Sequence, residues 1–189
     1  EKNKIKILDC TLRDGGYYNN WEFKRDLINE YLGVMDDIKV DYVEIGFRFI
    51  DKIKTKGPCG YSDENFLKSL KIPKNLKIGI MINAADFVNS KEIISLAKKN
   101  FRPKKKSLIS LVRIACHHNE IKLILPLINW LKKSGYKVGV NIMQIPELSF
   151  KEIKNSVLLI KKAKADILYF ADSLGSLDAD KTSKIIKKI

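Results

Sequence analysis

Residues able to do chemistry recur at one kind of place in this sequence, the end of a short apolar run. The first run leads into Thr11-Leu12-Arg13-Asp14-Gly15-Gly16, which sets a guanidinium beside a carboxylate. A carboxylate at such a place can bind a hard divalent cation. The adjacent guanidinium can hold a substrate carboxylate or stabilise an enolate oxygen. The alternative for an isolated Arg-Asp pair is an ion pair that caps a turn.

Five later apolar runs also carry polar side chains or end in them. These are Glu44 and Arg48, Asn83, Arg113 followed by Cys116-His117-His118-Asn119, Asn141 and Gln144, and Asp172-Ser173. We expect His117 to serve as an acid or a base. We expect Asn141 and Asp172 to contact a substrate. For each, the alternative is hydrogen bonding that only ends a strand or starts a helix.

The apolar runs predict six strands that alternate with amphipathic helices. We expect strands at 5–10, 42–46, 77–82, 108–114, 138–143 and 167–171. We expect helices at 26–38, 63–70, 90–99, 119–133, 149–163 and 178–189. Strands that are almost continuously apolar are typical of a parallel sheet buried on both faces. The alternation predicts right-handed βαβ units, either in a doubly wound sheet or in a (β/α)₈ barrel.

The length of 189 residues discriminates between these two folds in part. A full barrel takes roughly 250 residues, about 31 per unit, so six units fit and eight do not. Polar groups on six strand ends that meet at one point favour the barrel. We therefore predict an α/β fold of the TIM-type (β/α) barrel class. Residues 1–189 would form the first six units of one domain, with strands seven and eight absent.

An incomplete barrel has a physical consequence at its edges. The edges of strands one and six would be open to pairing with another chain. We therefore expect this chain to be a piece of a longer protein, or a homo-oligomer in which a second copy covers these edges.

The composition narrows the class of partner. The net charge is +14, but the lysines are dispersed along the chain. We therefore expect a solvated basic surface that draws anionic substrates, and no nucleic-acid partner; a basic nucleic-acid-binding module is the alternative. No apolar run is long enough to predict a membrane span. The three cysteines form no CxxC pair, so we expect neither a disulfide scaffold nor a zinc site, and a cytoplasmic location.

Four motifs in series resemble one family. Asp9-Cys10-Thr11-Leu12-Arg13-Asp14-Gly15 is similar to the first-strand signature of the HMG-CoA lyase-like (DRE-TIM) metallolyases. Val43-Glu44-Ile45-Gly46, Leu111-Val112-Arg113-Ile114-Ala115 and Ala171-Asp172-Ser173-Leu174-Gly175 resemble their second, fourth and sixth strands. The resemblance covers the whole chain in order and points to the 4-hydroxy-2-oxovalerate aldolase branch.

The resemblance implies a barrel enzyme that cleaves a 4-hydroxy-2-oxo acid to pyruvate and an aldehyde with Mn²⁺ or Mg²⁺. Asp14 would be a metal ligand. Arg13 would hold the carbonyl or enolate oxygen, and Glu44 would belong to the polar network around it. The partner would be a small 2-oxo acid. The alternatives are a condensing acyltransferase of the isopropylmalate or homocitrate synthase type, or a degenerate barrel without catalysis.

The chain departs from the family pattern at two places. The family's remaining metal ligands are a His-x-His pair on strand seven, which we expect beyond Ile189. The adjacent His117-His118 is no substitute, because neighbouring strand residues point to opposite faces. Where the aldolases have a general-base histidine, this chain has Tyr17, so we expect Tyr17 to transfer a proton in its place.

Overall fold

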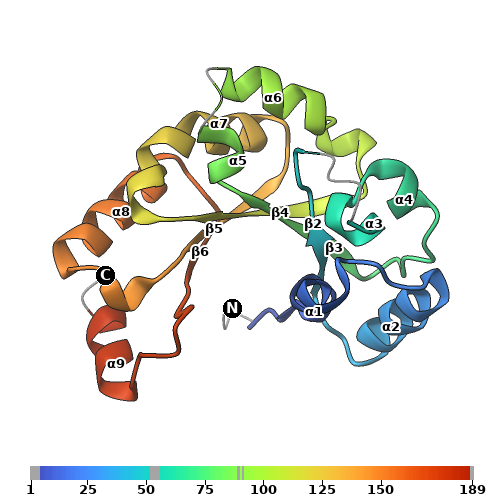
Figure 1. Ribbon diagram of the computed structural model, residues 1–189, viewed down its shortest axis with the longest axis horizontal. Coiled ribbons are helices and arrows are strands. Elements are labelled where there is room, and N and C mark those ends of the chain that lie inside the picture. The colour runs from blue at the N-terminus through green and yellow to red at the C-terminus, as the bar shows by residue number, and fades with distance from the viewer. Residues whose placement is uncertain (1–4, 52–55, 89, 91, 188–189) are drawn as a thin grey trace. The chain divides into compact units, whose positions relative to one another are not determined.

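The computed structural model describes residues 5–51, 56–88, 90 and 92–187. The strands follow one another across one sheet in chain order, β1 to β6, and the pairs β1–β2, β2–β3 and β5–β6 are parallel. A doubly wound sheet reverses its strand order at a switch point, whereas a (β/α) barrel keeps the order of the chain. The order therefore confirms a TIM-type fold present as six βα units (Figure 1).

The described elements have short strands and longer helices. The strands are β1 Leu8–Asp9, β2 Tyr42–Phe47, β3 Lys77–Asn83, β4 Ile109–Cys116, β5 Lys137–Ile142 and β6 Ile167–Phe170. The helices are α1 Thr11–Asn19, α2 Arg25–Asp37, α3 Pro58–Tyr61, α4 Glu64–Lys68, α5 Ala85–Val88, α6 Ile93–Asn100, α7 Ile121–Lys133, α8 Phe150–Lys162 and α9 Ala179–Lys187. Three short 3-10 helices are η1 Lys104–Lys106, η2 His118–Glu120 and η3 Ile145–Glu147.

The chain divides into two compact units, each with its own contacts. Unit 1 comprises Glu1–Ile82 and Arg102–Val112, and unit 2 comprises Asn83–Phe101 and Arg113–Ile189. The first half of strand β4 belongs to unit 1, and the second half belongs to unit 2. Among the described residues, no helix has both the length and the apolar character that a membrane span requires.

Unit 1 is built around strand β2, whose six residues are all buried. Helices α1 and α3 pack against β2, and α3 also packs against α1 (Figure 1). Helix α4 begins at Asp63, whose carboxylate accepts hydrogen bonds of 2.9 Å from the backbone N–H groups of Asn65 and Phe66. This N-cap satisfies amides that the helix itself leaves unpaired, so the helix starts where the sequence predicts.

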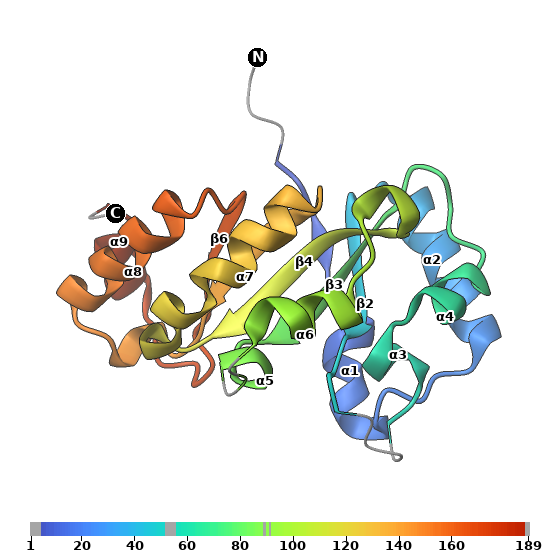
Figure 2. The ribbon, with the colours of Figure 1, turned by 90° about the horizontal axis from the view of Figure 1, so that it is seen from above.

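Unit 2 is built around α7, which packs against β5, α6 and α8 (Figure 2). The apolar face of α7 recurs at helical spacing and is fully buried: Ile121, Ile124, Leu127, Ile128 and Leu131. Burying one such side chain stabilises the fold by about 1.5–3 kcal/mol. The face therefore holds the helix layer of unit 2 onto its strands.

The prediction was wrong about the start of the chain. The first strand is Leu8–Asp9 and not 5–10, because only these two residues pair with β2 while Ile5 and Ile7 are exposed. The following segment, for which no element was predicted, is helix α1. The short helices α3 and α5 were also missed. Four-residue helices are too short to show a hydrophobic period.

Candidate functional site

Helix α1 positions the Arg13–Asp14 pair directly after β1. The carboxylate of Asp9 ends the strand and accepts hydrogen bonds from the backbone N–H of Thr11 at 2.8 Å and from its hydroxyl at 3.1 Å. Tyr31 on α2 donates a further hydrogen bond to Asp9. The chain therefore turns sharply from strand to helix, and Asp14 falls in the first helical turn. A negative charge there is favoured by the helix dipole.

Arg13 is held by two carboxylates of unequal burial. Its Nε donates to Oε1 of Glu44 at 2.7 Å, and its Nη1 lies 2.5 Å from Oδ1 of Asp14. The Glu44 side chain is completely buried, the Arg13 side chain is 15% exposed, and the Asp14 side chain is 61% exposed. The guanidinium thus lies between a buried anchor and a carboxylate that faces solvent.

The second strand is irregular where it meets Arg13. Glu44 and Phe47 are three residues apart, so a regular strand would point them to opposite faces. The pairing of β2 with β3 shifts register between these two residues. Both side chains then reach the same helix: Glu44 bonds Arg13, and the Arg13 guanidinium carbon lies 5.9 Å from the centre of the Phe47 ring. A bulge that redirects a side chain in this way is frequent beside active sites.

The electrostatics of this group keep Arg13 charged. Burial by itself lowers the pKa of the guanidinium, but the nearby Glu44 and Asp14 carboxylates more than offset this and raise the pKa above its ordinary value. Arg13 is therefore a fixed positive charge with a set direction. Such a group is suited to binding an oxygen on which negative charge develops.

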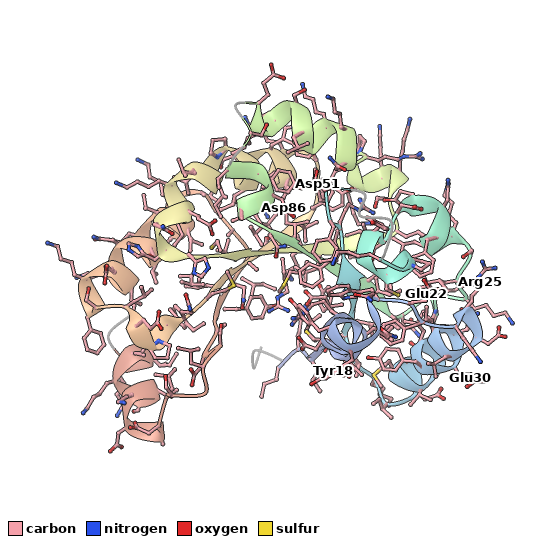
Figure 3. All side chains as sticks on the ribbon, in the orientation of Figure 1. Tyr18, Glu22, Arg25, Glu30, Asp51 and Asp86 are labelled. Atoms are coloured by element: carbon pink, nitrogen blue, oxygen red, sulfur yellow. The ribbon has the colours of Figure 1, made fainter. Side chains whose placement is uncertain are left out.

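Tyr17 lies one turn after Arg13 on α1, and its ring contacts the same phenylalanine. The ring centres of Tyr17 and Phe47 are 6.1 Å apart, and those of Tyr17 and Trp21 are 4.9 Å apart. Tyr17 is 63% exposed although one side of it packs. Its neighbour Tyr18 is 95% exposed and projects from the helix (Figure 3). Tyr17 is therefore held by aromatic contacts with Phe47 and Trp21, whereas Tyr18 is exposed.

Trp21 packs against helix α1, although it was not predicted to belong to the site. Its indole N–H donates to the backbone carbonyl of Arg13 at 2.9 Å, and the residue is buried. A Cβ on Gly16 would lie 2.0 Å from Cδ1 of the indole. The second glycine of the Gly-Gly pair is therefore needed for Trp21 to pack, and that pair was the available sequence signal.

In unit 2, the structure brings Asn141 together with an arginine that the sequence reasoning did not select as a site residue. Arg113 on β4 is buried, and its Nη2 donates to Oδ1 of Asn141 at 3.3 Å. The guanidinium carbon of Arg113 lies 4.3 Å from the centre of the Tyr169 ring on β6. Gly139 makes room, because a Cβ there would lie 2.9 Å from the Tyr169 ring and 3.1 Å from Cγ of Arg113.

His117 and Asp172 occupy separate places in unit 2. His117 is exposed, directly precedes η2 and lines a cavity that Gln144 also lines. The carboxylate of Asp172 accepts hydrogen bonds from the backbone N–H groups of Leu177 at 2.7 Å and of Ser176 at 3.0 Å. These bonds lower the pKa of Asp172, with the bond from Leu177 contributing most. Asp172 thus stabilises the loop that follows it, by binding the backbone of Ser176 and Leu177.

Two of the three cysteines, Cys59 and Cys116, are buried. Burial raises the pKa of both Cys59 and Cys116 to about 12, and nearby carboxylates add to the shift. A thiol with such a pKa holds almost no thiolate at neutral pH. Cys116 therefore does not act as a thiolate nucleophile beside His117.

The described residues do not form a complete metal site. No three His, Cys, Asp or Glu side chains of this part of the chain are grouped to hold a metal ion. Asp14, the predicted ligand, is already paired with Arg13 and faces solvent. A single exposed carboxylate falls short of the six oxygen ligands that a hard divalent cation takes, even when water supplies several.

Comparisons with known proteins agree with the motifs. No family model matches the chain. The chain is 24% identical over 140 residues to an oxaloacetate decarboxylase of Mycobacterium tuberculosis, covering 73% of this chain and 39% of that protein. It is 25% identical over 177 residues to a 4-hydroxy-2-oxovalerate aldolase of Carboxydothermus hydrogenoformans, covering 92% of this chain and 50% of that protein. The chain therefore spans half or less of the length of these relatives.

A solved structure is similar over nearly the whole chain. It is the N-terminal domain of a proposed aldolase from Bacteroides vulgatus, with a TM-score of 0.79 and 29% sequence identity. The match covers 97% of this chain and 60% of that one. These matches support the resemblance of the four motifs to the HMG-CoA lyase-like (DRE-TIM) superfamily and to its aldolase branch.

Proposed function

We propose that this chain carries the enolate-stabilising part of a lyase that cleaves a 4-hydroxy-2-oxo acid to pyruvate and an aldehyde. The observation that supports this most is the anchoring of Arg13 through Nε to the buried Glu44. An arginine held at Nε presents its planar Nη groups in a set direction, as recognition of a carboxylate or an enolate requires. The similarity to proteins named aldolase and decarboxylase points to the same chemistry.

In the proposed reaction, the C4 hydroxyl gives its proton to a general base, for which we propose His117, and the C3–C4 bond breaks. The electron pair of that bond forms the enolate of pyruvate, and the aldehyde leaves. The enolate then takes a proton at C3 to give pyruvate. Arg13 binds the oxygen on C2, where negative charge develops as the bond breaks, and so stabilises the transition state more than the ground state.

Tyr17 is the proposed proton donor to C3. It follows Arg13 by one helical turn, so both side chains lie on the same face of α1. Both contact the ring of Phe47, and the Tyr17 ring is exposed to an incoming substrate. From unit 2, we propose His117 as a second group for proton transfer, and Asn141 and Asp172 as substrate contacts.

A divalent cation, Mn²⁺ or Mg²⁺, is the proposed cofactor, and Asp14 its proposed ligand. The described residues offer no group of three ligands for the ion. What this chain's own side chains contribute is the fixed positive charge of Arg13 and the phenol of Tyr17.

The test is pyruvate formation from a panel of 4-hydroxy-2-oxo acids, followed by coupled NADH oxidation with Mn²⁺ or Mg²⁺ present. We expect Arg13→Lys to lower kcat by about 10²–10³-fold, the loss typical of removing a donor to a developing oxyanion. Arg25→Lys is the matched control, because Arg25 is exposed on α2. Absence of pyruvate with every acid, or equal rates for Arg13→Lys and the parent, contradicts the proposal.

Decarboxylation of oxaloacetate is a second candidate, which the similarity to the mycobacterial protein favours. Loss of CO₂ from oxaloacetate leaves the same pyruvate enolate, so Arg13 would have the same role. The same coupled assay with oxaloacetate distinguishes the two reactions once metal-catalysed background is subtracted. Pyruvate from oxaloacetate alone would favour decarboxylation, and pyruvate together with a trapped aldehyde would favour the aldol cleavage.

A further inference from the structure

The loops that follow β4 and β5 in unit 2 line a cavity of about 240 Å³ that is open to solvent. The first loop contains η2 and the second contains η3, so the cavity lies at the carboxyl ends of these two strands. This is the end of the strands at which (β/α) barrels bind their ligands. Five polar side chains contribute to its lining: His117, His118, Asn119, Gln144 and Glu147.

The lining mixes hydrogen-bond donors with acceptors. The amides of Asn119 and Gln144 each offer both, the Glu147 carboxylate accepts, and an imidazole can do either. A hydroxyl group also donates and accepts, so a chain of hydroxyl groups can pair with every member of this set. An alkyl chain would instead remove water from these groups without replacing the lost hydrogen bonds, which is costly.

Part of the cavity wall is fixed in place before any ligand arrives. Nε2 of His118 lies 3.2 Å from Oε1 of Glu152 on α8. The other oxygen of Glu152 accepts hydrogen bonds from the backbone N–H of Ser149 at 2.8 Å and from its hydroxyl at 2.6 Å. His118 is thereby tied to the capping box that starts α8. A wall that is already ordered lowers the entropic cost of binding.

Two apolar side chains, Met143 and Leu148, complete the lining. They suit the C–H groups of a hydroxylated carbon chain. The volume falls below the roughly 300–1,000 Å³ of pockets for drug-sized ligands, so the ligand is a short chain of about four carbons.

We propose that this cavity binds a short polyhydroxylated chain, the chemistry of a polyol or a small open-chain sugar. As a statement about substrate, this rests on the proposed function: the aldehyde half of the cleaved acid would be polyhydroxylated, not a plain alkyl aldehyde. As a binding site, the cavity is independent of the lyase chemistry and can be tested separately.

The test uses the methyl groups of methionine as reporters in the full chain. The sequence has three methionines, Met35, Met81 and Met143. Met143 lines the cavity, whereas Met35 on α2 and Met81 on β3 belong to unit 1. With ¹³C-labelled methionine methyls, titration with erythritol should move the Met143 signal along a saturable curve. The Met35 and Met81 signals should stay in place, and 1-butanol should produce no saturable shift.

Two variants test whether the Met143 shift reports binding in the cavity. Gln144→Ala and Asn119→Ala should each weaken erythritol binding by about two- to tenfold, the range for one lost neutral hydrogen bond. Asn129→Ala, an exposed position on α7, is the matched control and should bind as the parent does. An unchanged far-UV circular dichroism spectrum and urea midpoint in each variant show that the fold is retained.

The outcomes separate this proposal from the proposed lyase function. No saturable shift of Met143, an equal shift with 1-butanol, or unweakened binding in both cavity variants overturns the polyol site. Saturable binding of erythritol supports the site even where no pyruvate is formed from any acid. Pyruvate formation without a Met143 response leaves the lyase standing and overturns the polyol assignment.

Discussion

Two arginines of this chain, Arg13 in unit 1 and Arg113 in unit 2, are held by different means. Arg13 of unit 1 lies on a helix, is paired with the carboxylates of Glu44 and Asp14, and keeps 15% of its side chain exposed. Arg113 of unit 2 lies within a strand, is buried, donates to the amide of Asn141 and stacks on the ring of Tyr169.

This difference in partners and exposure indicates different roles for the two arginines. Arg13 is anchored at one edge and faces an exposed acidic neighbour at the other, so a ligand oxygen can approach it. Arg113 reaches from β4 to a partner on β5 and to another on β6, so its contacts join three strands. The two ion pairs leave the Arg13 side chain partly exposed, whereas the Arg113 side chain, which stacks on Tyr169, is buried.

Removing the charge of Arg13 should have the largest effect. Arg13→Met leaves the fully buried Glu44 carboxylate without the guanidinium and should lower the free energy of unfolding by about 3 kcal/mol. Glu44→Gln should cost less, because Arg13 keeps its contact with the exposed Asp14. Urea unfolding of the two single variants and the double variant measures this.

The double variant tests directly whether Arg13 and Glu44 stabilise the fold as a pair. If the pair acts as a unit, Arg13→Met with Glu44→Gln should cost clearly less than the two single losses added together. Strictly additive losses would show that the two side chains contribute independently, and the contrast with Arg113 would disappear. Asp37→Asn, an exposed change of charge on α2, is the control.

Two glycines offer a comparison of the packing around each arginine. Alanine at Gly16 would place Cβ 2.0 Å from the buried Trp21, whereas alanine at Gly139 would place it 2.9 Å from Tyr169. We expect Gly16→Ala to cost about 3 kcal/mol and Gly139→Ala about 1 kcal/mol, within the range for overpacked sites. Urea unfolding, with tryptophan fluorescence to follow displacement of Trp21, checks the order.

Gly33→Ala provides the matched control for these two changes. A Cβ at Gly33 meets nothing within 4 Å, and the residue lies inside α2. Alanine is about 1 kcal/mol better than glycine in a helix, so this variant should be stabilised. A loss at Gly33 similar to that at Gly16 would show that the added methyl group is unfavourable even where it meets no atom, and that contact with Trp21 does not set the outcome.

Much of the fold could be predicted from the sequence, because most strands are apolar runs and most helices have a 3.6-residue period. The start of α1 could not, since a segment with Gly15-Gly16 is typical of a loop. What makes the helix is tertiary: Trp21 packs against Gly16 and bonds the Arg13 carbonyl. Contacts of this kind leave no periodic signal.

The candidate site was predicted in its residues more than in its geometry. Arg13, Asp14 and Glu44 were selected, and the structure joins all three. The contact between Phe47 and Arg13 depends on a shift in the pairing register of β2 with β3. The alternation of side chains along a regular strand does not predict such a shift. Arg113 was noted within the fourth strand and its motif but was given no role in the site, because its contact with Tyr169 joins positions that are distant in the sequence.

Replacing Arg113 by lysine should have a moderate effect. Lysine keeps the charge but loses the planar group that stacks on Tyr169 and bonds Asn141, so we expect a loss of about 1 kcal/mol in unfolding free energy. A cycle with Tyr169→Leu isolates the stacking energy. If Arg113→Lys costs as much when Tyr169 is absent as when it is present, stacking does not hold this arginine.

The smallest effect concerns the loop that follows β6. Backbone hydrogen bonds from Leu177 and Ser176 lower the pKa of Asp172 below its ordinary value of 3.8, so the folded loop favours the carboxylate. A lowered pKa means that this stabilisation is complete above the unfolded pKa of about 3.9 and is lost as the pH falls through the folded pKa. Asp172→Asn should therefore speed amide hydrogen exchange at Ser176 and Leu177 at neutral pH. Once exchange rates are corrected for their intrinsic pH dependence, the difference from the parent should shrink below about pH 4. A difference that stays constant down to the acid limit would mean that the side chain acts through its shape and not through its charge.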